Sequence, residues 1–202
     1  FRMAVTEIKC NCGGKMSVTV PKQSFFYLAN AVEDKDLLEF GLNANTLVFI
    51  KSDMLFSTRI ISEPFMNIDR LLNMPDKMLV AKIKANDMKT MAETVSMITN
   101  VSEDTAPVLL KFKNNNLQLS IESTEAESML NVPIESVNMI SGEFYYNAKY
   151  FSDMLKVIRG DVDVYMTKRG VLYASNPVSE YMLTNSKKRS VKRKSKKTKK
   201  AA

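Results

Sequence analysis

Three stretches of the chain carry the spacing of an amphipathic helix, with apolar residues at positions i, i+3, i+4 and i+7. The expected helices cover residues 21–32, 87–98 and 148–158. Pro21 favours the start of the first helix, and Asn86 or Asp87 can cap the second. The three apolar faces consist of Phe25, Leu28, Ala29 and Val32, of Met88, Met91, Ala92 and Val95, and of Phe151, Met154, Leu155 and Ile158.

Around these helices, apolar and polar residues alternate in short runs, which predicts β-strands. Runs precede each helix, and further runs follow it, separated by turns of polar residues and glycine. The expected strands cover residues 2–9, 16–20, 37–40, 46–50, 54–61, 78–85, 108–112, 117–121, 127–132, 142–146, 162–166, 171–174 and 181–183. Strand, helix and antiparallel meander thus recur three times along the chain.

This recurrence indicates an internal repeat, although α+β proteins also alternate in this way by chance. Each expected helix has one apolar stripe, and each meander can bury one of its faces beneath that stripe. We therefore expect an α+β fold in which helices cover one face of antiparallel sheets.

The composition supports a folded protein and excludes several kinds of chemistry. Apolar residues make up 45% of the 202 residues and charged residues 25%, enough for a hydrophobic core. The chain has no histidine, which excludes a histidine base, a histidine zinc ligand and a Ser-His-Asp triad. We expect no cofactor and no metal ion, because Cys10 and Cys12 fall short of four zinc ligands and Gly13-Gly14-Lys15 lacks the spacing of a phosphate loop.

The basic charge of the chain is concentrated at its end. The formal net charge is +7, but residues 187–200 hold ten Lys and Arg and no acidic residue. Without them, 19 basic residues face 22 acidic ones, which leaves a net charge of −3. Residues 187–202 have almost no apolar side chains, so we expect a disordered tail that binds DNA or RNA non-specifically.

The sequence also indicates the cellular compartment of the protein and whether the chain is a fragment. Two cysteines cannot build a disulfide framework, no apolar run approaches the ~18 residues of a membrane span, and the first ten residues lack the apolar core of a signal peptide. We therefore expect a cytoplasmic protein. The chain begins with Phe1 rather than Met, which favours a fragment or a processed piece of a longer protein.

Four segments carry a resemblance to a known family. They are residues 1–5 (FRMAV), 18–22 (VTVPK), 57–72 (STRIISEPFMNIDRLL) and 142–155 (GEFYYNAKYFSDML). These segments resemble four motifs of the bacterial sliding clamp, the beta subunit of DNA polymerase III. In the same order, the motifs are its Arg-Leu-Ala strand, its Val-Ile-Val-Pro helix start, its Ser-Arg-Leu to Arg-Val segment and its Gly-Phe-Asn-Ala-Lys-Tyr helix. The collinear set spans about residues 1–184.

The resemblance implies a DNA-clamp fold and a division into parts. Residues 1–75 would form the second half of clamp domain two, residues 76–186 clamp domain three, and residues 187–202 a basic tail. A clamp is a processivity factor without catalytic activity of its own. It encircles double-stranded DNA independently of sequence, here as a homodimeric ring when the protein is full length.

Clamp helices face the DNA, so the resemblance places the basic residues of the polar helix faces at the DNA channel. These residues are Lys22, Lys89, Lys149, Lys156 and Arg159. Lys149, Ser152 and Lys156 lie close to one helical stripe. An ordinary solvated helix face is the alternative interpretation, because surface lysine is common.

The family's partner pocket lies between domains two and three and binds short apolar motifs of the polymerase and the clamp loader. By register it falls on Arg2, Met3, Met66, Arg70, Leu71, Met182 and Leu183. Methionine suits a pocket that repacks around several ligands, although plain core packing explains the same residues. Met66 and Ile68 replace the family's usual proline and aromatic residue, and Thr184-Asn185 replaces Met-Pro.

Ring closure in the family joins domain three of one subunit to domain one of the next. The residues that fall near this edge are Met97, Ile98, Glu122, Glu125 and Glu127. The acidic residues would suit a basic partner surface, and a solvated strand or loop is the alternative.

Two other functions remain open at this point. One is a shorter clamp that closes its ring from three subunits, and the other is a nucleic-acid-binding protein that acts through its basic tail. An enzyme is the least expected class, because no nucleophile has a base near it in any motif. A magnesium site built from carboxylates is the form of catalysis that the sequence leaves open.

Overall fold

The computed structural model describes residues 2–8, 10–11, 13–63, 65–101, 107–123 and 126–187, with only the backbone described at Asn100 and Val101. Three predictions concern residues outside these ranges: the zinc interpretation of Cys12, the interface role of Glu125 and nearly all of the basic tail. The chain divides into two compact units. The smaller unit is Cys10–Ile68, and the larger unit combines Phe1–Lys9 with Asp69–Ala202.

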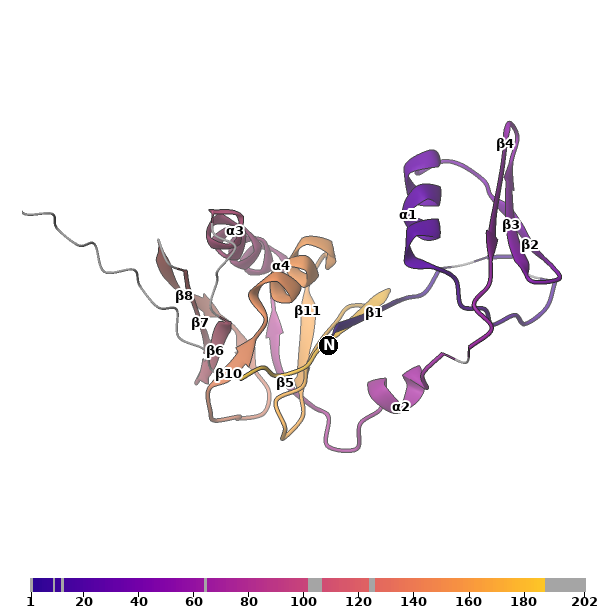
Figure 1. Ribbon diagram of the computed structural model, residues 1–202. Helices are drawn as coiled ribbons and strands as arrows, with labels where there is room; N and C mark the ends of the chain where they lie inside the picture. Colours follow the sequence, from indigo (N-terminus) through magenta and orange to yellow (C-terminus); the bar gives the residue numbers. More distant parts are fainter. Residues whose placement is uncertain are drawn as a thin grey trace, which may run out of the picture. The chain divides into compact units, whose positions relative to one another are not determined.

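The larger unit contains two antiparallel sheets (Figure 1). The six-stranded sheet has the order β1 (Arg2–Thr6), β13 (Ser179–Leu183), β12 (Leu172–Ser175), β11 (Val162–Met166), β5 (Met78–Ile83) and β9 (Glu135–Ser136). The four-stranded sheet has the order β10 (Phe144–Tyr146), β6 (Val108–Lys113), β7 (Asn116–Glu122) and β8 (Glu127–Pro133).

The second and third repeats exchange their first strands. Strand β5 leads into the second repeat but pairs with β11 of the third, whereas β10 leads into the third repeat but pairs with β6 of the second. Strand β1 likewise pairs with β13, far along the chain. Neither repeat can complete its sheet alone, so the two fold together as one unit.

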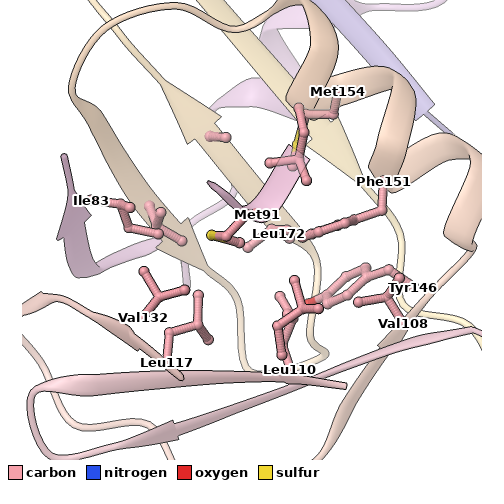
Figure 2. Packing of buried hydrophobic residues seen from close by; sticks show 14 of the residues in the cluster. Ile83, Met91, Val108, Leu110, Leu117, Val132, Tyr146, Phe151, Met154 and Leu172 are labelled. Carbon is pink, nitrogen blue, oxygen red and sulfur yellow. The ribbon is translucent and has the colours of Figure 1, made fainter. Parts of the chain in front are cut away.

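Two helices, α3 (Ala85–Val101) and α4 (Ala148–Val157), lie next to each other in the larger unit (Figure 1). Their apolar faces meet both sheets in one core. Figure 2 shows side chains of the four-stranded sheet pointing toward side chains from the two helices and the other sheet. Among them are Leu110, Leu117 and Val132 on one side and Ile83, Met91, Phe151, Met154 and Leu172 on the other.

The smaller unit consists of α1 (Lys22–Ala31) and the meander β2 (Glu39–Asn43), β3 (Thr46–Lys51) and β4 (Met54–Arg59). Phe49 lies at its centre, with the rings of Phe25 and Phe40 at 6.2 Å and that of Phe56 at 6.3 Å. Among its described residues, Leu28 and Leu47 are the buried apolar side chains. Burial therefore contributes much less free energy here than in the larger unit.

The fold class, the three helices and the three meanders are confirmed, and the corrections are local. Residues 16–20 form a single bridge from Thr19 to Ile61 rather than a strand. Of the predicted apolar face of α1, only Leu28 is buried, and Phe25 is 52% exposed. As the sequence predicts for residues 65–74, a short helix, α2 (Ile68–Leu72), forms in the segment that joins the units in sequence.

The start of α3 is also corrected, because the helix begins at Ala85 rather than after Asn86 or Asp87. The carboxylate of Asp161 accepts the Ala85 backbone N–H at 3.0 Å and the Lys84 ammonium at 2.8 Å. These two hydrogen bonds hold the pKa of Asp161 below its ordinary value. The cap thus comes from a distant residue, which local sequence patterns do not reveal. Within the described residues, no helix is long and apolar enough to cross a membrane.

Candidate partner-binding pocket and DNA-facing helices

A cavity of about 430 Å³ lies where β1 and β13 meet α4 in the larger unit. It is lined by Arg2, Met3, Ala4, Tyr150, Asp153, Met154, Lys156, Val157, Tyr181 and Leu183. Its floor is mostly apolar, and its charged groups come from three side chains. A short apolar peptide fits this chemistry, because such sites combine apolar surface with a few polar groups that orient the ligand.

Helix α4 contributes one continuous stripe to this cavity. Tyr150, Asp153, Met154 and Val157 follow the spacing i, i+3, i+4 and i+7 and therefore share a helix face. Asn147 caps this helix, because its side chain accepts the Tyr150 N–H at 3.0 Å. Val157 is 54% exposed, so the stripe reaches from the core to the surface.

Arg2 links the edge strand β1 to α4 across the cavity. Its guanidinium lies 4.6 Å from the centre of the Tyr150 ring and forms an ion pair with Asp153. The side chains of Arg2 and Asp153 are 41% and 39% exposed, so the ion pair adds little to folding stability. Its main consequence is geometric: a cation and a flat ring stand at the rim of an apolar cavity.

Met3 and Met182 lie on the other face of the six-stranded sheet. Residues paired directly across antiparallel strands share a face, and Met3 pairs with Met182, which pairs with Tyr173. Arg2 and Leu183 form the next pair and point to the opposite face, toward α4. The hydroxyl of Tyr173 donates to the backbone oxygen of Leu71 at 2.7 Å, which ties α2 to this face of the sheet.

The structure thus distributes the seven predicted pocket residues over several places. Arg2 and Leu183 line the cavity, and Met3 also borders it although its side chain shares the other face with Met182 and Tyr173. Leu71 contributes its backbone oxygen, which accepts the Tyr173 hydroxyl. Arg70 is exposed on α2, and Met66 lies in the smaller unit with 47% of its surface exposed. Their joint role in binding a peptide stays a prediction.

Sequence reasoning missed several residues of the cavity: Ala4, Tyr150, Asp153, Met154, Val157 and Tyr181. Met154 was expected only in the core, and Lys156 only at the DNA. The exposed Val157, seven positions after Tyr150, is the signal that could have identified a second apolar stripe on this helix.

All five residues predicted to face DNA are exposed. Lys89 lies on α3, and Lys149 and Lys156 lie on α4, followed by Arg159. Lys22 begins α1 in the smaller unit. Lys156 also lines the cavity, so it has two candidate roles.

Two details change the expected composition and charge balance of this surface. Ser152 is 2% exposed, so it lies inside the protein and does not belong to a solvent-facing stripe with Lys149 and Lys156. Lys89 lies 3.9 Å from Glu93 one turn away, which offsets part of its charge. The surface of α3 and α4 is therefore only mildly positive.

The predicted interface residues lie at the edge of the four-stranded sheet and on α3. Met97 is 64% exposed, whereas Ile98 is 7% exposed and belongs to the core. Glu122 and Glu127 pair across β7 and β8, which places two carboxylates beside the outermost strand. Met97 and this acidic corner are accessible to a partner, and Ile98 is not.

A larger open hollow of about 650 Å³ lies at the start of α3. Its charged residues include Lys84 and Asp161, which form an ion pair, and Asp161 also caps the helix. Within the described ranges, no group of three or more Cys, Asp or Glu side chains is arranged to hold a metal ion. The hollow therefore offers mixed charge without a defined ligand geometry.

Solved structures of bacterial DNA polymerase sliding clamps have the same arrangement of strands and helices. The DNA polymerase sliding clamp of Bacillus subtilis matches with a TM-score of 0.78 and 16% identity, over 93% of this chain and 52% of that chain. A protein of Eubacterium rectale described as a DNA polymerase III beta subunit matches with a TM-score of 0.79 and 18% identity, over 92% and 52%. This chain has the sliding-clamp fold.

The clamp fold confirms the family resemblance at the level of structure. The sliding clamp of Pseudomonas aeruginosa agrees, with a TM-score of 0.75 and 18% identity over 92% of this chain and 53% of that one. The chain spans about half the length of the clamps that it matches. No protein-family model matches the chain, and no curated protein does.

Proposed function

We propose that this chain is the carboxyl-terminal part of a DNA sliding clamp, a processivity factor that tethers a replicative polymerase to duplex DNA. The observation that carries the proposal is the clamp fold over 92% of the chain, at a TM-score of 0.79. The apolar cavity formed by β1, β13 and α4 supports the tethering role. Clamps act by topology, so the proposed role is non-catalytic and requires no cofactor.

The DNA contacts of the proposed clamp are weak and independent of sequence. Lys89, Lys149, Lys156 and Arg159 would approach phosphates from the adjacent helices α3 and α4, and Lys22 would do so from α1. A few lysines beside Glu93 and Asp87 attract a polyanion without holding it in one register. Such a surface suits movement along DNA better than tight binding.

Ring closure would use the edge of the four-stranded sheet. Met97 and the carboxylates of Glu122 and Glu127 would meet a basic surface of the next subunit, and polymerase and clamp-loader peptides would enter the cavity. We propose a homodimeric ring for a full-length protein of the size of the matched clamps. A ring of three shorter subunits is the alternative.

A second candidate function is supported by one specific observation, the ten Lys and Arg of residues 187–200. A protein that binds nucleic acid through this tail would use the folded units as a scaffold. Its affinity would fall steeply with salt, because each neutralised phosphate releases counterions.

Deletion of residues 187–202 separates the two functions. We expect the shortened protein to keep stimulating its polymerase on long templates, with processivity within about twofold of the intact protein, because a ring acts by topology. Its equilibrium affinity for short linear duplexes should fall strongly, and the salt dependence of binding should become shallow. The measurements are primer-extension length and binding to a labelled duplex at several salt concentrations.

A matched control keeps the length of the tail but replaces its ten Lys and Arg by Ser. If both variants lose processivity along with duplex binding, the tail performs the function and the clamp proposal fails. If only duplex binding falls, the tail is an accessory to the clamp.

A further inference from the structure

Two exposed basic residues, Lys168 and Arg169, stand at the turn that joins β11 to β12. The backbone of this turn is closed by hydrogen bonds of its own. The Gly170 N–H donates to the Thr167 oxygen at 2.9 Å, and the Thr167 N–H donates to the Val171 oxygen at 3.0 Å. The turn therefore presents two positive side chains from a fixed backbone.

Two further hydrogen bonds tie the turn to distant parts of the larger unit. The Lys168 backbone N–H donates to the carboxylate of Asp76 at 3.1 Å, and the hydroxyl of Tyr146 donates to the Gly170 oxygen at 2.9 Å. Tyr146 is fully buried in the core, so the turn has a rigid support. The positions of the two basic residues thus depend on the tertiary fold.

The turn also lies against the segment that leads into the basic tail. A Cβ at Gly170 would lie 3.0 Å from the side-chain nitrogen of Asn185, so glycine permits this close approach. The Asn185 side-chain oxygen accepts the Tyr145 N–H at 3.1 Å, and the Ser186 N–H donates to the Tyr145 oxygen at 2.7 Å. The chain is therefore attached to β10 immediately before Lys187, the first residue of the basic run.

The contact between the turn and this segment brings two positively charged stretches together. Arg169 directly precedes Gly170, and Lys187 follows Asn185 by two residues, which span at most about 7 Å of chain. Duplex DNA carries one phosphate per ~1.7 Å of its axis, so about 15 Å of duplex presents about nine phosphates. One duplex can therefore be contacted by the turn and by residues 187–200 at the same time.

Two acidic residues that adjoin this region are already engaged. The carboxylate of Asp76 accepts the Lys168 N–H, and Glu143, just before β10, forms an ion pair with Lys111 at 2.7 Å. The hydroxyl of Tyr145 also donates to Glu143. These contacts offset part of the negative charge that would otherwise oppose a polyanion beside the turn.

We propose that Lys168 and Arg169 form, together with the basic tail, a second DNA-binding surface that is distinct from the lysines of α3 and α4. Its ligand is the phosphate backbone of duplex DNA, which it binds independently of sequence. The surface requires no ring, so this inference goes beyond the proposed clamp function. In a clamp, it would raise the rate of encounter with DNA.

The test is the double variant Lys168→Ser, Arg169→Ser in the full chain. The matched control is Lys15→Ser, Arg59→Ser, which removes one lysine and one arginine from exposed positions of the smaller unit. The probe is a fluorescein-labelled duplex of about 20 base pairs, measured by anisotropy from about 50 to 200 mM salt. Both double variants should keep the melting temperature of the unchanged chain, because all four side chains are exposed.

We expect the turn variant to weaken duplex binding at least fivefold at about 50 mM salt. Its salt slope should fall by about 1.8, because each lost phosphate contact removes about 0.9. The control should bind within about twofold of the unchanged chain. Unchanged binding in the turn variant would overturn the inference, and so would equal losses in the two double variants, because net charge alone would then explain the binding.

Primer extension with the same proteins separates this inference from the clamp proposal. A clamp should keep its processivity in both double variants, because a ring acts by topology. If processivity holds and the turn variant binds duplex as well as the control does, the second surface is refuted and the clamp stands. If the unchanged chain does not stimulate a polymerase but the turn variant alone loses duplex binding, the clamp proposal fails and the second surface stands.

Discussion

Replacing Ala4 by tryptophan is expected to weaken binding of a short apolar peptide at least tenfold. Ala4 is exposed on the edge strand β1, lines the cavity of about 430 Å³ and pairs with Tyr181. An indole at this position would fill apolar space that a ligand needs, while strands accept tryptophan readily. A tenfold loss corresponds to about 1.4 kcal/mol. At ~25 cal/mol per Å², this equals about 55 Å² of apolar contact.

Thr6→Trp is the matched control for this variant. Thr6 lies two residues further along β1, points to the same face and is exposed, but it does not line the cavity. Among the described residues, its hydroxyl forms a hydrogen bond only with the Ser179 hydroxyl, an exposed contact of 3.2 Å. Anisotropy titration of a fluorescein-labelled apolar peptide of six residues should separate the two variants. Equal affinity in Ala4→Trp and Thr6→Trp would show that the cavity is not the docking site.

Phe151→Ala should reduce the free energy of unfolding by about 3–5 kcal/mol. Phe151 is 1% exposed, stacks on Tyr146 with ring centres 6.2 Å apart and anchors α4 in the core (Figure 2). Its loss leaves a cavity between the helix and both sheets. Because α4 carries Tyr150 and Asp153, peptide binding should weaken along with stability.

Urea unfolding followed by circular dichroism measures this effect. Phe26→Ala is the matched control, since Phe26 lies on α1 and is 63% exposed. Surface truncations of this kind change stability by about 0.5 kcal/mol or less. A Phe151 variant as stable as the Phe26 variant would contradict the description of a single shared core.

The sequence predicted the helices and meanders well where local periodicity dominates. In α4 and at the residue that follows it, all four predicted apolar residues are buried, because the helix packs against two sheets. In α1 the same spacing yields one buried residue, Leu28, since the smaller unit has only one meander to cover it. The exchange of β5 and β10 between repeats could not be predicted, because pairing between distant strands leaves no local pattern.

The pocket residues named from the family register do not share one surface, and the reason can be found in the sequence. Arg2 and Met3 are neighbours in a strand, as are Met182 and Leu183, and neighbouring strand residues point to opposite faces. The four strand residues of the family register therefore divide between two faces, and the other three lie outside the sheet. The contribution of Tyr150 depends on a helix packed against a distant strand, which only the three-dimensional structure reveals.

The most direct test of the clamp account is retention on circular DNA. The protein, in its natural assembly and with its loader, is placed on a nicked plasmid at high salt, and one restriction cut is then made. We expect stable retention on the circle and loss within minutes after the cut, because a ring slides off a free end. Equal dissociation from the circle and the linear product would show that electrostatic attraction alone holds the protein, and the account of a sliding clamp would be wrong.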